Sequence, residues 1–138
     1  MIVCGVMSGT SLDGIDVIIV EIHGKNDKLH HKQVFAKTFD FTASLRLKLQ
    51  KIVDGIPVTA QELAETEEMY ESEVSNSILK AQKLSSSIIE LVGSHGQTIY
   101  HRPRSDKRAF TWQIGSGRRI QAAVNSTTKS SCPRDYSD

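Results

Sequence analysis

Residues 2–22 of this 138-residue chain read IVCGVMSGTSLDGIDVIIVEI. The apolar run at residues 2–7 is short, and the run at residues 16–22 is rich in β-branched side chains, a composition that favours buried strands. Residues 8–13 lie between the two runs, and their glycine, serine and aspartate residues are typical of turns. The stretch therefore predicts a strand, a turn and a second strand at the start of the chain.

The predicted turn carries groups that suit phosphate. Two glycines five residues apart enclose two hydroxyl groups and a carboxylate, in the order Gly9, Thr10, Ser11, Leu12, Asp13 and Gly14. Glycine allows a ligand to approach the backbone closely, and such a turn offers N–H and O–H donors to phosphate oxygens. Because a carboxylate repels phosphate, Asp13 and Asp16 would act through Mg²⁺ or its waters. An ordinary Ser/Asp/Gly hairpin turn explains the same spacing.

A P-loop NTPase is excluded. The pattern GxxxxGK[ST] needs a lysine and a hydroxyl residue after the second glycine, and Ile15 and Asp16 stand at those positions. A strand follows the turn here, whereas a P-loop leads into a helix.

The rest of the chain predicts a mixed α/β domain. Further strands are expected at residues 32–41, 88–92 and 109–114, and helices at 43–54, from the capping-box pattern at Thr59 to about residue 85, and from 117 to 124. Six glutamates crowd the first half of the second helix: Glu62, Glu65, Glu67, Glu68, Glu71 and Glu73. A solvated helix face is the expected explanation, and an acidic partner surface is the alternative.

Composition narrows the function classes. The net charge of +1 provides no general basis for nucleic-acid binding, and no apolar run approaches the ~20 residues that span a bilayer. The N-terminus has no basic segment of the kind that begins a signal peptide, so we expect a cytoplasmic protein. Cys4 and Cys132 lie at opposite ends of the chain and suggest neither a disulfide framework nor a zinc site. Residues 125–138 contain no aliphatic side chain and predict a disordered tail.

Two later segments are further candidates. The SHGQT segment, residues 94–98, follows the apolar run at 88–92, and ligand crevices form at strand ends in open α/β sheets. His95 and Gln97 can hydrogen-bond a sugar or an amide there, although a simple polar turn is equally compatible. The QIGSGRRI segment, residues 113–120, lacks the third glycine of a dinucleotide fingerprint, so we interpret Ser116 as a helix N-cap with Arg118 and Arg119 exposed.

Taken together, four motifs resemble the N-terminal part of the anhydro-N-acetylmuramic acid kinase family. They are GVMSGTSLDGID at residues 5–16, SHGQT at 94–98, HRP at 101–103 and TWQIG at 111–115. The resemblance extends from about residue 2 to about residue 124 and implies the sugar-kinase/Hsp70/actin fold. The chain would then be an incomplete N-terminal lobe of an actin-like, ribonuclease H-like ATPase over residues 1–124. Its mixed sheet would start with a β-hairpin phosphate loop, and a non-family tail would follow.

The resemblance also implies a reaction. The family uses ATP and Mg²⁺ to open and phosphorylate 1,6-anhydro-N-acetylmuramic acid, which gives N-acetylmuramic acid 6-phosphate in the recycling of bacterial cell-wall sugars. The family's ATP phosphate loop matches Gly9, Thr10, Ser11, Leu12, Asp13, Gly14, Ile15 and Asp16, with Asp13 as a water-mediated Mg²⁺ ligand. The SHGQT segment would lie at the cleft between the lobes, with His95, Gln97 and Thr98 as sugar contacts.

One departure from the family pattern matters for activity. In the family, an Asp-Phe-Arg motif that carries the proposed general base follows a further strand, whereas this chain ends in NSTTKSSCPRDYSD. We therefore assign no catalytic residue, Asp135 included, and expect a truncated member that is inactive alone. The alternative is a non-catalytic nucleotide-binding or interaction module that forms a homodimer or associates through an exposed sheet edge.

Overall fold

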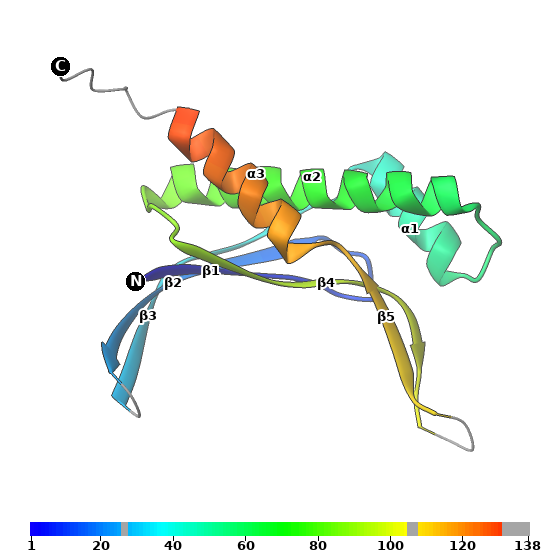
Figure 1. Ribbon diagram of the computed structural model, residues 1–138, viewed down its shortest axis with the longest axis horizontal. Coiled ribbons are helices and arrows are strands. Elements are labelled where there is room, and N and C mark those ends of the chain that lie inside the picture. The colour runs from blue at the N-terminus through cyan, green and yellow to red at the C-terminus, as the bar shows by residue number, and fades with distance from the viewer. Residues whose placement is uncertain (26–27, 105–107, 131–138) are drawn as a thin grey trace.

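The computed structural model describes residues 1–25, 28–104 and 108–130, with only the backbone described over residues 126–130. Eight elements follow one another within these residues (Figure 1): β1 (Ile2–Ser8), β2 (Ile15–Lys25), β3 (Lys28–Phe39), α1 (Ala43–Val53), α2 (Ala60–Ser85), β4 (Leu91–Arg102), β5 (Phe110–Ile114) and α3 (Gly117–Ser130).

The strands form one mixed sheet in the order β3-β2-β1-β4-β5. Central strand β1 pairs antiparallel with β2 and parallel with β4, so that Ser8 lies opposite Ile15 on one side and Gly5 lies opposite Gly93 on the other. The β2–β3 and β4–β5 pairs are antiparallel. The predictions of a mixed α/β domain and of an initial strand, turn and strand are confirmed.

All three helices lie on one face of the sheet, and the outer hairpins β2–β3 and β4–β5 curve away from them (Figure 1). Alternation along the strands matches this layering, because Cys4 and Val6 are buried while Met7 between them and the turn is 54% exposed. The core lies between sheet and helices, where Leu45 of α1 and Ile78 of α2 are fully buried. The opposite face of the sheet carries no helix within the described residues.

Helix α2 begins as its sequence predicts. The Thr59 side chain accepts a hydrogen bond from the Glu62 N–H, and the Glu62 carboxylate accepts one from the Thr59 N–H, so the capping box is complete. The helix ends at Ser85, and Ser86 adopts a left-handed conformation with φ of 52°. This conformation turns the chain back toward the sheet.

The strand predicted at residues 88–92 is wrong in its bounds. Strand β4 begins at Leu91, and Ile88 is 73% exposed. The strand continues through the SHGQT segment to Arg102, because β1 pairs with it up to Gln97 and β5 pairs with it from there onward. Ser94, Gln97 and Thr98 pair with neighbouring strands, whereas the β1–β4 register shifts across His95 and Gly96. The segment therefore lies within a strand, at an irregularity of the pairing, and not beyond the strand's end.

The last helix is longer than predicted. Helix α3 continues past residue 124 to Ser130, so the first six residues of the expected tail have helical backbone. Residues 131–138, which include Cys132 and Asp135, lie outside the described residues. Cys4 is a free, buried cysteine in β1.

Candidate functional site

The turn between β1 and β2 exposes its polar side chains and buries its apolar ones. Thr10, Ser11 and Asp13 are exposed, whereas Leu12 is 2% exposed and adopts a left-handed conformation with φ of 56°. A hydrogen bond of 3.2 Å from the Leu12 N–H to the Gly9 carbonyl closes the turn. Because the buried Leu12 side chain holds this unusual backbone, two hydroxyls and a carboxylate face outward together.

Of the last three residues of the predicted loop, only Asp16 is exposed, and the other two pack into the interior. Gly14 and Ile15 are buried, and a Cβ atom at Gly14 would lie 2.5 Å from the Phe39 carbonyl oxygen. Asp16 is exposed on the helix-free face of the sheet, where its carboxylate accepts a hydrogen bond from the Thr38 hydroxyl. Gly9 is half-buried, and the other seven predicted loop residues divide into outward-facing polar groups and buried anchors.

Three side chains from other elements support the turn. The Ser8 and Tyr70 hydroxyls lie 2.9 Å apart in the interior. The Gln97 side-chain amide donates to the Gly9 carbonyl over 3.2 Å. On the outside, the Arg46 guanidinium of α1 donates to the Asp13 carbonyl over 3.1 Å. These contacts fix the turn from α1, α2 and β4, and Arg46 brings a positive charge to it that the sequence motifs do not indicate.

A hollow of about 570 Å³ adjoins the turn on the helix-free face of the sheet. Met7 and Asp16, which flank the turn, contribute to its wall. Gly5 and Gly93 are paired across β1 and β4 and also line it, and a Cβ atom at Gly93 would meet no atom within 4 Å. A Cβ atom at Gly5 would lie 3.1 Å from Ile18 Cγ2, so it is at Gly93 that a ligand can approach the backbone of this hollow.

The structure separates the SHGQT side chains that the sequence groups together. His95 is exposed and lies 3.0 Å from the Gln113 side-chain amide, which also lies 3.4 Å from the Thr98 hydroxyl. Gln97 is fully buried and contacts the turn instead. Gly96 between them has a φ of 78°, and a Cβ atom there would lie 2.7 Å from the Ile114 carbonyl oxygen. Direct sugar binding by His95 and Thr98 stays a prediction, whereas Gln97, predicted as a third sugar contact, presents no exposed surface to a sugar in this structure.

Sequence comparison places this geometry in a family. A family model described as anhydro-N-acetylmuramic acid kinase matches residues 1–132. The chain belongs to the anhydro-N-acetylmuramic acid kinase family. The relative of that name from Acaryochloris marina is 35% identical over 130 residues, which cover 93% of this chain and 34% of the relative. The relative from Gloeothece citriformis is 38% identical over 117 residues, which cover 85% of this chain and 30% of the relative. The chain therefore spans about a third of the length of these curated relatives.

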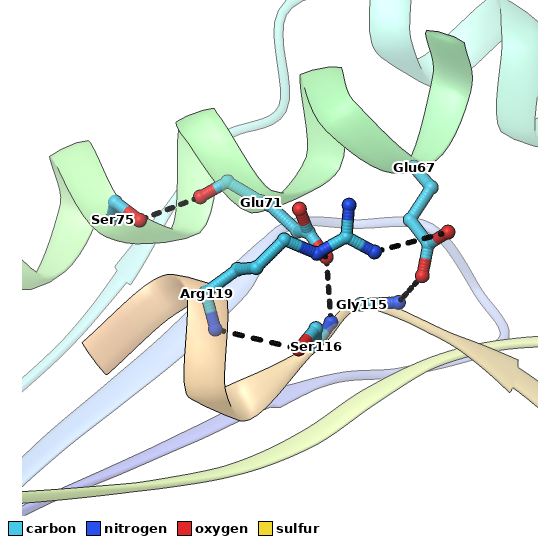
Figure 2. Close-up of polar contacts among 6 residues, drawn as sticks. All are labelled: Glu67, Glu71, Ser75, Gly115, Ser116 and Arg119. Atoms are coloured by element: carbon cyan, nitrogen blue, oxygen red, sulfur yellow. Dashed lines mark hydrogen bonds and ion pairs between the residues drawn. The ribbon is translucent and has the colours of Figure 1, made fainter. Parts of the chain in front are cut away.

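In this member of the anhydro-N-acetylmuramic acid kinase family, the QIGSG segment is not an anion site. Figure 2 shows the start of α3 against α2, where the Glu67 carboxylate accepts from the Gly115 N–H at 2.9 Å and the Glu71 carboxylate accepts from the Ser116 N–H at 2.7 Å. Arg119 completes the cluster at 3.3 Å from Glu71. Two carboxylates of the protein occupy the positive end of this helix, the place that a bound anion would take.

This cluster corrects one prediction and extends another. The expectation of a solvated glutamate face is wrong for Glu71, which is 8% exposed, and holds for Glu65 and Glu68, which are exposed. Ser116 is the N-cap as predicted, since its hydroxyl accepts from the Arg119 N–H at 3.3 Å. Arg119 is exposed as predicted, but its guanidinium is ion-paired. Hydropathy spacing could not indicate this cluster, because its partners lie 45 or more residues apart.

The described residues offer neither a ready-made metal site nor a membrane-spanning helix. The described residues contain no group of three or more His, Cys, Asp or Glu side chains placed to hold a metal ion. Asp13 as a magnesium ligand therefore stays a prediction, and it fits the habit of Mg²⁺ of taking one or two carboxylates together with phosphate oxygens and waters. None of the described helices has the length and apolar character needed to cross a bilayer.

Proposed function

We propose that residues 9–16, the turn between β1 and β2 with the first two residues of β2, bind the terminal phosphates of ATP. The observation that carries the proposal is the outward display of the Thr10 and Ser11 hydroxyls with Asp13, on a turn whose underside is fixed by buried contacts. Rigid donors stabilise phosphate charge without reorganising at the moment of binding. The sheet order and the opening antiparallel hairpin support the finer proposal of an actin-like, ribonuclease H-like N-terminal lobe.

Each polar group of the turn has a distinct role in this proposal. The Thr10 and Ser11 hydroxyls donate to phosphate oxygens, and the Arg46 guanidinium lowers the cost of bringing negative charge to the turn. Asp13, together with Asp16 on the helix-free face of the sheet, would hold Mg²⁺ directly or through its waters. Bound Mg²⁺ would neutralise charge on the phosphates during phosphoryl transfer.

Family membership supports a proposal for the whole reaction. Relatives three times as long carry the name anhydro-N-acetylmuramic acid kinase. We propose that this chain contributes the phosphate-binding part of an ATP-dependent kinase for 1,6-anhydro-N-acetylmuramic acid, with His95 and Thr98 near the sugar. The product would be N-acetylmuramic acid 6-phosphate, formed with opening of the anhydro ring.

Calorimetric titration tests the phosphate site. We expect the 138-residue chain to release or absorb heat with Mg²⁺–ATP and to give a flat trace with adenosine, which lacks phosphates. A Cβ atom at Gly9 would lie 3.4 Å from Ser11 Oγ, an ordinary contact, so Gly9→Val keeps the fold but narrows the approach to the turn. The variant should lose the ATP signal, while Gly117→Val, at an open position, should keep it. Equal ATP binding by both variants contradicts the proposal.

Catalytic turnover needs more than a phosphate-binding turn. The described residues supply one wall of a phosphate site and no second lobe to shield the transferred group from water, which kinases require. The pure chain should therefore form no N-acetylmuramic acid 6-phosphate from the anhydro sugar and ATP. Detection of that product above a no-protein control would contradict this proposal.

A second candidate is a non-catalytic interaction module. The observation that favours it is the helix-free sheet face, where Met7 is 54% exposed and Ile18 is 39% exposed, together with edge strands β3 and β5. Light scattering after size-exclusion chromatography tests it. A homodimer at micromolar concentration supports association through the face or an edge, and a monomer at all concentrations argues against it.

A further inference from the structure

Gln97 is the least solvent-accessible polar side chain near the turn. It lies in β4 with 0% exposure, and its amide nitrogen donates to two backbone carbonyls, that of Gly9 at 3.2 Å and that of Thr98 at 3.1 Å. The side-chain oxygen Oε1 is buried and has no hydrogen-bond partner among the described residues. Because both neighbours are acceptors, only the NH₂ group can face them, and this orientation is the one that leaves Oε1 unpaired.

This orientation has a consequence for the turn. The Gly9 carbonyl accepts from both the Gln97 amide and the Leu12 N–H, so it is held toward the interior. In a planar trans peptide the C=O and the following N–H point in opposite directions. The Thr10 N–H therefore points away from Gln97 and out of the turn. No described residue accepts a hydrogen bond from it.

We infer that Gln97 is a positioning residue for phosphate binding, which fixes the Gly9–Thr10 peptide so that the Thr10 N–H is aimed at a phosphate oxygen of a nucleoside triphosphate. The inference rests on the proposed function of the turn and adds a residue to it that acts without touching the ligand. The unpaired Oε1 atom supports a functional role, because a buried acceptor without a donor destabilises the fold and an apolar side chain of the same length would avoid that penalty.

Nuclear magnetic resonance of the ¹⁵N-labelled chain, titrated with Mg²⁺–ATP and separately with inorganic tripolyphosphate, tests the inference. In the natural chain the Thr10 amide resonance should shift with both ligands. Gln97→Met removes the amide but preserves the volume, so it should keep the thermal unfolding midpoint at or above that of the natural chain. It should weaken binding of both ligands about tenfold, the equivalent of one hydrogen bond to a charged group, and should reduce the Thr10 shift at saturation. Gln50→Met, on the exposed side of α1, removes a matched amide and should change neither.

The outcomes separate the two proposals. If the natural chain binds neither ligand, the proposed function of the turn is wrong and the inference falls with it. If the natural chain binds and Gln97→Met binds equally with the same Thr10 shift, only the inference is overturned. Should Gln97→Met not fold, scalar coupling across the hydrogen bond from the Gln97 amide to the Gly9 carbonyl decides in the natural chain. Detectable coupling together with the Thr10 shift supports the inference, and absence of either overturns it.

Discussion

The Ser8 hydroxyl at the end of β1 and the Tyr70 hydroxyl in the middle of α2 lie 2.9 Å apart in the core. Ser8 immediately precedes the turn, and Tyr70 is fully buried, so this contact fixes one end of the candidate site to the longest helix. Burial raises the pKa of the Tyr70 phenol, which keeps the hydroxyl protonated and able to donate. The Tyr70 ring also leaves no room for a side chain at position 115, because a Cβ atom at Gly115 would lie 2.5 Å from Tyr70 Cε1.

Tyr70→Phe should destabilise the chain by about 1 kcal/mol, because it leaves the buried Ser8 hydroxyl with only a long contact of 3.5 Å to the Gly96 carbonyl. Urea unfolding of Tyr70→Phe, Ser8→Ala and the double variant measures the loss. We expect the double variant to lose less than the sum of the single changes, since both remove the same bond. Strict additivity would show that the hydroxyls do not interact. Tyr100→Phe, at a half-exposed position, is the matched control.

Glu71→Ala should cost roughly 2 kcal/mol of unfolding free energy, because the Ser116 N–H loses a charged acceptor in a buried place. Glu68→Ala on the exposed side of the same helix should cost less than ~0.5 kcal/mol. Chemical denaturation of both variants provides the comparison. Equal, small losses for the two would mean that the carboxylates at the start of α3 add nothing to stability.

Acid stability should depend on Glu62. The Thr59 backbone N–H and the Lys51 ammonium group hold the pKa of the Glu62 carboxyl at about 2, below its ordinary value of 4.5. A carboxyl with a lowered pKa in the folded state contributes stability at pH values above 4.5, and this contribution disappears as the pH falls toward about 2. Glu62→Gln should therefore flatten the loss of stability in that pH window, as measured by thermal unfolding. Glu65→Gln should leave the pH profile of the natural chain unchanged.

Arg46 should contribute to ATP binding through its charge. Its guanidinium contacts the turn at the Asp13 carbonyl. Arg46→Gln should weaken Mg²⁺–ATP roughly fivefold, on the order of 1 kcal/mol, and the effect should shrink at high ionic strength. Lys80→Gln on α2 removes the same net charge and should leave the affinity unchanged. If both variants bind equally well at low salt, Arg46 plays no electrostatic part.

Local signals explain what the sequence could predict. The β-branched run after the turn, the Thr59 capping box and the Ser116 N-cap are each decided by neighbouring residues, and all three are found in the structure. The sequence could not indicate the interior position of Gln97, because its partner Gly9 lies 88 residues away. The sequence could not indicate the full length of β4 either, because that length depends on pairing with β1 and β5 and not on a local pattern.

Assigning the backbone amides of the ¹⁵N-labelled chain and adding Mg²⁺–ATP tests the central claim most directly. We predict shift changes that centre on the amides of residues 9–13 and fade along α2 and the β2–β3 hairpin. Adenosine should produce none of them. Shifts that centre elsewhere, or no shifts at millimolar ATP in a folded chain, would contradict the claim that this turn is a phosphate site.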